Sequence, residues 1–474
     1  MAKQPMLKFV TVERDMPQKR EADLRNTDFD EIYAEYAEAK AEEQASRCSQ
    51  CGVPYCQSHC PLHNNIPDWL RLTATGRLQE AYDISQATNT FPEICGRICP
   101  QDRLCEGNCV IEQSGHGTVT IGAVEKYITD TAWEKGWVKT IKPAQEQDKS
   151  VAIIGAGPGG LAAADVLRRE GVQVTVYDRY DRAGGLLTYG IPGFKLEKDV
   201  VMRRIEQLEK GGVEFVLNCN VGEDISFDAI RGKHDAVIIA AGVYKTRDLQ
   251  GPGSGAEGIV RAIDYLTVSN KVSNFGDTIE EYENGEMNAK GKKVVVIGGG
   301  DTAMDCNRTS IRQEAKSVTC AYRRDEANMP GSKREVQNAK EEGVKFLFNR
   351  QPVAIVGEDK VEGIKMVSTR MGEPDANGRR RPEVVPGSEE IVPADVILVA
   401  FGFRPSPADW FEGNKIETDE SGRVIAKAEA RFPYQTTNPK IFAGGDMVRG
   451  SDLVVTAIDE GRKAAEGSLD YLDV

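Results

Sequence analysis

Two stretches of the chain show the same order of apolar and polar positions. In each, a segment that is apolar after its first residue, at 150–154 or at 293–297, leads into a glycine-rich turn and then into apolar residues at helical spacing. A run without alternation is typical of a strand buried on both faces of a parallel sheet. Further strands are predicted at 172–178, 235–242 and 394–402. Because strand and helix patterns return at 440–474, we predict two doubly wound α/β dinucleotide-binding folds, the second inserted into the first.

The region before these runs has helical spacing instead. Residues 20–46 and 121–133 each predict an amphipathic helix, and residues 134–149 lose the apolar period and predict a linker. The polar residues 269–293 separate the two α/β units, and the basic segment 378–382 predicts a solvated turn between strands. We place the helical domain at 1–146 and divide the α/β units into three segments, 147–265, 266–402 and 403–474.

The charge balance narrows the range of partners. The 474 residues include 60 basic and 74 acidic side chains, a net charge of −14, which disfavours nucleic acid and anionic membranes as partners. The longest apolar runs are far shorter than the ~20 residues that a membrane-spanning helix needs. The N-terminal sequence has no apolar segment of signal-peptide length. We therefore expect a soluble, cytoplasmic protein.

Eight of the eleven cysteines lie in one window of the helical domain, at Cys48, Cys51, Cys56, Cys60, Cys95, Cys99, Cys105 and Cys109. Disulfides, structural zinc and iron–sulfur clusters are the three explanations. Disulfides need an oxidising compartment, and zinc sites usually show paired Cys-x2-Cys knuckles or added histidines. Only Cys48 and Cys51 have that spacing. Cys56-x3-Cys60-Pro61 has the form in which the last cysteine binds a second cluster, so the pattern favours two [4Fe–4S] clusters.

The first glycine turn has the spacing of a dinucleotide-binding loop. Gly155, Gly157 and Gly160 follow a strand and open a helix, the context that gives the motif its meaning. Glycine lets the backbone turn tightly and lets a pyrophosphate approach the helix N-terminus, where free amides stabilise negative charge. Asp178 ends the next strand and is placed to accept a hydrogen bond from a ribose hydroxyl.

The second glycine turn has a different specificity signal. It reads Gly298, Gly299, Gly300, Asp301, Thr302 and Ala303, with alanine in place of the third glycine of the motif. The following strand ends in Arg323 and Arg324 and has no acid where the first unit has Asp178. Guanidinium groups bind a 2′-phosphate through charge-assisted bonds. This unit is therefore expected to prefer NADPH, the alternative being that the two arginines are only a solvated strand end.

Iron–sulfur clusters and two dinucleotides in one chain pose a problem of electron counting. A nicotinamide gives up two electrons as a hydride, each cluster accepts one, and a flavin can do both. We therefore expect FAD between NADPH and the clusters. The strand and helix predicted at 440–474 contain groups that suit a flavin. Gly445 and Asp446 are placed for a ribitol hydroxyl, and a helix N-terminus at Thr456 and Ala457 is placed for the flavin ring. This strand and helix belong with the first unit, so FAD is assigned to the first loop.

Five longer motifs run from the cysteine array to the C-terminal strand. They are Cys48-Ser-Gln-Cys-Gly-Val-Pro-Tyr-Cys, the run from Cys95 to Cys109, Gly184-Gly-Leu-Leu-Thr-Tyr-Gly-Ile-Pro, Tyr322-Arg-Arg-Asp-Glu-Ala-Asn-Met-Pro and Ala443-Gly-Gly-Asp. Together they closely resemble the small (β) subunits of bacterial NADPH-dependent glutamate synthases, over essentially the whole chain. Related modules occur in dihydropyrimidine dehydrogenase and in ferredoxin:NADP oxidoreductases.

The resemblance implies a route for the electrons. NADPH would reduce FAD, and the electrons would pass through the clusters to FMN on a large (α) subunit. There, ammonia released from glutamine and 2-oxoglutarate become glutamate. The motif that begins at Gly184 contains Gly185 and Leu186, and we assign both residues to FAD. We also assign Gly242, at the end of a strand, to FAD.

The resemblance also implies how the cysteines are divided. One cluster would be held by Cys48, Cys51, Cys56 and Cys109, and a second by Cys60, Cys99, Cys105 and a carboxylate at Glu125. Counting thiols alone would choose Cys95 as the eighth ligand. We favour Glu125, which leaves Cys95 as a buried bystander.

Two other functions remain open. A diaphorase or ferredoxin:NADP oxidoreductase module would serve a different electron acceptor, and a zinc-stapled assembly factor would carry nucleotide sites without function. An electron-input subunit is favoured because the sequence offers no nucleophile–base constellation for a third reactant, so the electrons must leave the chain.

Overall fold

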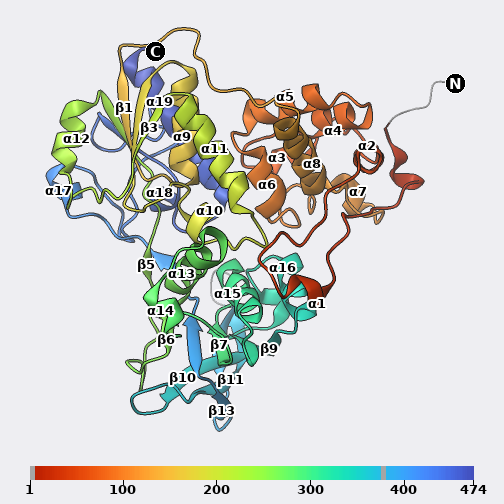
Figure 1. The fold of residues 1–474 in the computed structure, drawn as a ribbon, viewed down its shortest axis with the longest axis vertical. Coiled ribbons are helices and arrows are strands. Elements are labelled where there is room, and N and C mark those ends of the chain that lie inside the picture. The colour runs from red at the N-terminus through yellow and green to blue at the C-terminus, as the bar shows by residue number, and fades with distance from the viewer. Residues whose placement is uncertain (1–5, 375–379) are drawn as a thin grey trace.

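The part of the chain before the first apolar run is helical, as predicted. The computed structural model describes residues 6–374 and 380–474. Among these, the helices ahead of the first strand are η1 Lys8–Val10, α1 Ala22–Arg25, α2 Glu38–Ala45, α3 Tyr55–Ser58, α4 Ile66–Ala74, α5 Leu78–Thr88, α6 Pro92–Ile98, α7 Val110–Gln113 and α8 Ile121–Glu134. Helices α2 to α8 pack as one domain, orange and brown in Figure 1. Trp69, Tyr82 and Ile128 are buried in its core.

Residues 20–46 do not form the single helix that their spacing predicted. Residues 26–37 between α1 and α2 form no helix, and α1 lies beside α16 (Lys333–Glu341) of a later unit (Figure 1). The buried Arg25 guanidinium donates to Glu342 Oε1 at 3.0 Å and to Glu341 Oε2 at 2.9 Å. The segment crosses to another unit because its charged side chains find partners there, and these contacts override local helix propensity.

The first glycine loop follows the central strand of a five-stranded parallel sheet with the order β16-β4-β1-β2-β3. The strands are β1 Ser150–Ile154, β2 Gln173–Tyr177, β3 Val213–Val216, β4 Ala236–Ile239 and β16 Ile441–Ala443. The helices of this unit are α9 Pro158–Arg169, α10 Leu186–Tyr189, α11 Lys198–Lys210, α12 Phe227–Lys233, α17 Trp410–Gly413, α18 Asp446–Arg449 and α19 Val454–Leu472. The strands predicted at 150–154, 172–178 and 235–242 are confirmed, the last two with shorter ends.

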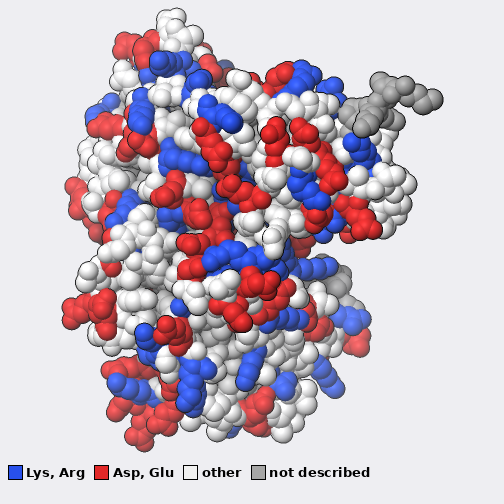
Figure 2. Space-filling view, turned by 45° about the vertical axis from the view of Figure 1, so that its right-hand side comes forward, with Lys and Arg blue, Asp and Glu red and all other residues white. Residues whose placement is uncertain are grey.

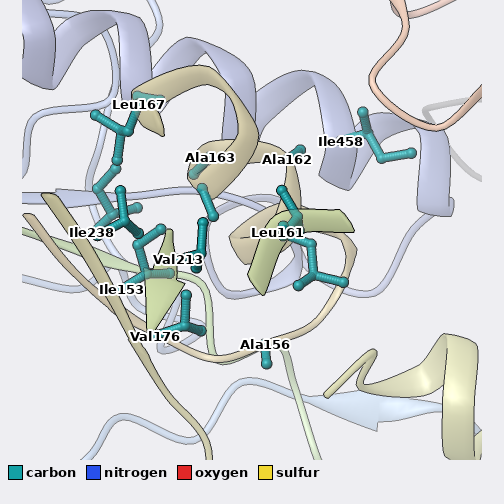
Figure 3. Packing of buried hydrophobic residues seen from close by; sticks show 14 of the residues in the cluster. Ile153, Ala156, Leu161, Ala162, Ala163, Leu167, Val176, Val213, Ile238 and Ile458 are labelled. Carbon is teal, nitrogen blue, oxygen red and sulfur yellow. The ribbon is translucent and has the colours of Figure 1, made fainter. Parts of the chain in front are cut away.

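Helix α9 packs between this sheet and α19. Figure 3 shows Leu167 and Ala163 of α9 above Ile153 of the sheet, with Ile458 of α19 in the same core. The two helices approach closely, since a Cβ on Gly461 of α19 would lie 2.1 Å from the Gly159 oxygen of α9. Each large apolar side chain fully buried here contributes about 1.5–3 kcal/mol. This packing fixes the start of α9 and the start of α19 relative to one another.

The second unit repeats the architecture with the strand order β6-β14-β7-β8-β9, again parallel. Its strands are β6 Ile259–Arg261, β7 Lys293–Ile297, β8 Ser317–Tyr322, β9 Lys345–Phe348 and β14 Val396–Val399. Its helices are α13 Ala262–Phe275, α14 Glu280–Glu283, α15 Asp301–Arg312, α16 and the short η2 Glu326–Asn328. The polar stretch predicted at 269–293 is therefore partly helical. Its buried Asn270 donates to the Tyr189 oxygen at 2.9 Å, a contact with the first unit.

The second unit is inserted into the first, because β16 returns to the first sheet after β14 has closed the second. The two connections pair with each other as the antiparallel strands β5 Lys245–Thr246 and β15 Phe403–Arg404. Strand β6 lies within residues 147–265, the range assigned to the first unit, yet it pairs with β14 of the second sheet. The second unit therefore begins between β5 and β6, before the predicted boundary.

An antiparallel sheet extends from the second unit (Figure 1). It contains β10 Arg350–Val356, β11 Gly363–Pro374, β12 Arg380–Val384 and β13 Glu390–Pro393. The basic segment predicted as a turn at 378–382 begins outside the described residues, and Arg380 to Pro382 belong to β12 rather than to a turn.

The surface carries charges of both signs. Acidic and basic side chains are interspersed over the described part of the face in Figure 2. No helix in the described part of the chain is long and apolar enough to cross a membrane.

Candidate functional site

The first glycine loop has the close backbone packing that a dinucleotide loop requires. Gly155 has a φ of +106°, and a Cβ there would lie 2.4 Å from the Ala240 oxygen. A Cβ on Gly160 would lie 1.9 Å from the Gly155 oxygen, so the start of α9 can approach the strand only through glycine. Gly157 is different, because a Cβ there would meet no atom within 4 Å. Gly157 thus faces an open space at the N-terminus of α9.

That open space is a cavity of about 480 Å³. Most residues predicted for FAD line it, namely Gly155, Gly157, Asp178, Leu186, Gly242, Gly445, Asp446 and Ala457. The other three lie behind its wall. Gly160 packs on Gly155, Gly185 packs on Gly157, and Thr456 donates its hydroxyl to the Leu453 oxygen at 2.7 Å, within the first turn of α19.

Asp178 is held at the edge of this cavity by two backbone amides. Its Oδ2 accepts from Ala156 at 2.6 Å, and its Oδ1 accepts from Tyr180 at 2.9 Å. Burial raises the pKa of Asp178, and these two amides oppose the rise. A carboxylate has about four acceptor positions, so Asp178 can fix the loop and still accept from a ribose hydroxyl.

Asp446 lines the same cavity, at the start of α18. Burial raises its pKa to about 7. The adjacent Glu460 carboxylate accepts from the Gly445 amide at 2.8 Å and from Arg449 Nε at 2.7 Å, which fixes the Gly445 turn. Sequence reasoning did not find Glu460, because its partner lies fifteen residues away on another element.

The second loop repeats the backbone geometry of the first. Gly298 has a φ of +154°, and a Cβ there would lie 2.5 Å from the Ala400 oxygen, whereas a Cβ on Gly300 would meet nothing within 4 Å. The Asp301 carboxylate accepts from the Ser332 amide at 3.0 Å. Ala303 is fully buried and replaces the third glycine without a clash. Gly300 therefore borders open space at the N-terminus of α15.

Arg323 and Arg324 stand at the end of β8, next to the second loop. Their carbonyls are fixed, since Arg323 O accepts from Thr369 Oγ1 at 2.8 Å and Arg324 O accepts from the Asn349 amide at 3.0 Å. Neither guanidinium forms an ion pair with the rest of the described chain, and the buried Nε of Arg324 has no hydrogen-bond partner. An unpaired buried donor on a cationic group suits an anionic ligand.

Four cysteines of the helical domain share one small pocket. Cys48, Cys51, Cys56 and Cys109 line it, with apolar side chains such as Leu70 around them. The Gln50 backbone and side-chain amides lie 3.4 Å and 3.3 Å from Cys48 Sγ, and Ser49 Oγ lies 3.0 Å from Cys51 Sγ. The described part of the chain holds no His, Cys, Asp and Glu grouping that fits a single metal ion. Thiols spread around a pocket suit a cluster, in which each binds a different iron.

The three thiols predicted for the second cluster, Cys60, Cys99 and Cys105, are each influenced by the charge of Glu125 on α8. Burial raises the pKa of Cys60 to about 12 and also raises that of Cys105, and the negative charge of Glu125 adds to both shifts. For Cys99 the largest cause is a hydrogen bond with Cys95, and Glu125 again contributes. The carboxylate is therefore within electrostatic range of all three thiols.

Glu125 itself is buried and fixed. Its Oε1 accepts from Asn64 Nδ2 at 2.9 Å and from Asn89 Nδ2 at 3.3 Å. Burial raises its pKa to about 8, and no cationic side chain contributes to the shift. A buried carboxylate without a cation is costly, and iron would supply the missing positive charge. The donor set of three thiols and one carboxylate thus fits a cluster.

Cys95 lies close to Cys60 and Cys99 and has a hydrogen-bond partner of its own. Its thiol donates to Asn89 Oδ1 at 3.7 Å, and its side chain packs in the apolar core of the first α/β unit. Cys95 also lies beside Cys99, so position alone leaves it as a second candidate ligand.

A second cavity, of about 220 Å³, lies where the three domains meet, and we call it the junction cavity. Cys95 and Cys99 line it from the helical domain, Leu186 and Val454 from the first unit, and Thr302 from the second. Leu186 and Val454 also line the larger cavity beside the first loop. One space therefore adjoins the predicted flavin site, the second glycine loop and the cysteines.

Three residues that line these cavities were not predicted from the sequence: Arg179, Tyr244 and Lys195. The Arg179 guanidinium stacks over the Tyr244 ring at 4.4 Å beside Asp178, and Lys195 lines the junction cavity. Tyr244 lies far from Arg179 in the sequence, so no local motif signals their contact.

Comparison with known proteins agrees with this architecture. Residues 25–137 match the family described as dihydropyrimidine dehydrogenase domain II, 4Fe-4S cluster, and residues 149–461 match the pyridine nucleotide-disulphide oxidoreductase family. The solved structure of Mycobacterium tuberculosis FprA in complex with NADPH superposes with a TM-score of 0.58 at 20% identity, covering 69% of this chain and 85% of FprA. At that identity the likeness establishes the fold.

Closer relatives define the family. The glutamate synthase [NADPH] small chain of Halomonas elongata is 58% identical over 98% of both chains. The putative oxidoreductase AegA of Escherichia coli is 52% identical over 98% of this chain, which spans 70% of that protein. Fold and site define an oxidoreductase with a 4Fe–4S domain and an FAD/NAD(P)-binding domain. Within that class, the chain belongs to the family of NADPH-dependent glutamate synthase small chains.

Proposed function

We propose that this chain is the electron-input subunit of a glutamate synthase and acts in the cytoplasm. NADPH would bind at the second loop, FAD at the first, and two [4Fe–4S] clusters in the helical domain. The partner would be a large subunit carrying FMN, where glutamine and 2-oxoglutarate give two molecules of glutamate. The junction cavity carries the proposal, because Leu186, Thr302 and Cys99 bring the three sites to one space. All eleven cysteines are free thiols, which agrees with a reducing compartment.

When bound, FAD would supply the conversion of a two-electron hydride into single electrons that iron–sulfur clusters can carry. The residues of the chain bind and orient. Gly155 and Gly157 would admit the pyrophosphate to the N-terminus of α9, Asp178 would accept a hydrogen bond from the ribose, and Asp446 would accept one from the ribitol. The free backbone amides at the start of α19 would stabilise negative charge on the ring system.

The second unit would select the nucleotide. Gly298 and Gly300 open the N-terminus of α15, and Arg323 and Arg324 would bind the 2′-phosphate that distinguishes NADPH from NADH. The unpaired Nε of Arg324 supports this role.

The pKa of Asp446 leads to a pH-dependent prediction. An ionised carboxylate accepts a hydroxyl hydrogen bond more strongly than a protonated one does, and burial raises the pKa of Asp446 to about 7, with Asp452, Glu460 and Arg449 as its charged neighbours. FAD binding to flavin-free protein should therefore be full above pH 7 and weaken by up to about tenfold per pH unit below it. Flavin fluorescence titrations from about pH 5.5 to 8.5 measure this. Asp446→Asn should flatten the profile, and an unchanged profile in that variant would contradict the assignment.

A second candidate function is an oxidoreductase that serves another acceptor. The 52% identity to the putative oxidoreductase AegA favours keeping it. Both functions use the same cofactor sites and differ in the protein that receives the electrons.

Reconstitution separates the two. The purified chain, mixed with a glutamate synthase large subunit, glutamine and 2-oxoglutarate, should form about two glutamates for each NADPH oxidised, since one hydride reduces one imine. Oxidation of NADPH with no glutamate formed, together with transfer to a ferredoxin-type acceptor, would favour the second function.

A further inference from the structure

One lysine joins the two dinucleotide units at the junction cavity. Lys195 belongs to the first unit, between α10 and α11, and lines the cavity. Its Nζ donates to Asp305 Oδ1 at 2.9 Å and lies 3.8 Å from Glu335 Oε2. Asp305 lies on α15 and Glu335 on α16, both in the second unit. The ammonium group of Lys195 therefore bridges the two units beside the junction cavity.

The contact is largely removed from water. The side chains of Lys195 and Asp305 are 13% and 7% exposed. Burial alone would lower the pKa of Lys195, but Asp305 and Glu335 outweigh it and hold the pKa above its ordinary value. Buried ion pairs require good geometry and are costly to break, because the remaining charge is left without compensation. This pair therefore favours one arrangement of the units over others.

The two acids do not depend on Lys195 equally. Glu335 has a second cation, since Arg308 Nη1 lies 2.6 Å from its Oε2. Lys195 is the one ion-pair partner that the described residues give to Asp305. Loss of Lys195 would thus strand the carboxyl of Asp305, whose pKa burial already raises to about 6.

Asp305 connects the ion pair with Lys195 to the second glycine loop, because Asp305 and the last residues of that loop both lie on α15. Asp305 follows Asp301 and Thr302 by about one turn of α15, so it is rigidly connected to the second loop. Lys195 follows α10, whose first residue Leu186 lines both cavities. We propose that Lys195 is a positioning residue, which docks the second unit so that a nicotinamide bound there meets the ring held by the first. This inference rests on the proposed function.

The test compares three variants of the holoprotein, loaded with flavin and clusters. Lys195→Met removes the charge and keeps most of the length, and Lys195→Arg restores a cation. Lys271→Met is the matched control, because Lys271 also bridges the units, to Asp181 at 3.1 Å, but is 24% exposed and does not line the cavity. A partly solvated pair of this kind contributes little.

Two signals are recorded. One is the limiting rate of flavin bleaching at saturating NADPH in stopped-flow mixing. The other is the change that saturating NADP⁺ causes in the spectrum of the oxidised flavin, which reports contact between the rings without turnover. Lys195→Met should slow bleaching by about tenfold or more, because small misplacements have large effects on rate, and should reduce the spectral change. NADP⁺ affinity and iron content should change little.

The outcomes are distinct. Recovery in Lys195→Arg and a normal Lys271→Met support the role. Equal rates and spectra in Lys195→Met and the parent protein, or a loss confined to NADP⁺ affinity, would overturn it. Failure of the parent protein to bleach with NADPH would instead refute the proposed function itself.

Discussion

A chain in which alanine replaces Glu125 should carry about four irons per flavin, whereas one in which alanine replaces Cys95 should keep about eight, the content of two [4Fe–4S] clusters. Glu125 is within electrostatic range of Cys60, Cys99 and Cys105 and has no cationic partner, while the Cys95 thiol already has a hydrogen-bond partner in Asn89 Oδ1. Removing a ligand therefore disrupts a cluster, and removing the bystander does not. Iron analysis against flavin content, after anaerobic reconstitution, gives the result.

A conservative variant sharpens this prediction. Glu125→Gln retains a side-chain oxygen for iron and should keep close to the full iron content, and Cys95→Ser serves as the matched polar change at the bystander position. Loss of iron in the Cys95 variants with full iron in Glu125→Ala would assign the eighth ligand to Cys95 and refute the division of ligands made here.

Replacing either Arg323 or Arg324 alone with leucine should raise the KM for NADPH by roughly 10- to 100-fold and leave the use of NADH little changed. Each lost charge-assisted bond to a phosphate is worth about 1.5–3 kcal/mol, and NADH lacks the 2′-phosphate. Because the Nε of Arg324 has no hydrogen-bond partner, we expect the KM for NADPH to rise more when Arg324 is replaced than when Arg323 is replaced. Steady-state kinetics with both nucleotides and a dye acceptor measure the effect.

The control for this pair is an arginine of the other unit. Arg431 is exposed and stacks on Phe432 at 5.0 Å, away from either glycine loop. Arg431→Leu should leave both KM values unchanged. Equal losses for NADPH and NADH in the Arg323 and Arg324 variants would show that they support the fold rather than read the phosphate.

Local patterns were sufficient for the elements that are buried in parallel sheets. The strands predicted at 150–154 and 293–297 became β1 and β7 with the predicted bounds, because strands covered on both faces are apolar at nearly every position; here only the first residues, Ser150 and Lys293, are polar. The loops that follow were found for a similar reason. Their glycines are dictated by backbone contacts within a few residues or with the adjacent strand, as the Gly160 contact with Gly155 shows.

Contacts between units could not be read from local patterns. The helix predicted at 20–46 is interrupted because Arg25 reaches Glu342, a buried carboxylate that also pairs with Arg308. Lys195 and Asp305 likewise meet only once the second unit has folded back on the first. The boundary near β6 was misplaced because β6 pairs with a strand more than a hundred residues later. In each case a distant partner, rather than local propensity, decides the structure.

Anaerobic addition of NADPH to the purified chain, followed by the large subunit with glutamine and 2-oxoglutarate, tests the central claim most directly. The absorption band of the oxidised flavin, at about 450 nm, should bleach when NADPH is added. The band should return when the large subunit and its substrates are added. In Glu125→Ala, with one cluster disrupted, bleaching should persist and the return should be much slower. A band that NADPH leaves unchanged, or a return as fast in Glu125→Ala as in the parent chain, would contradict the route from NADPH through flavin and clusters.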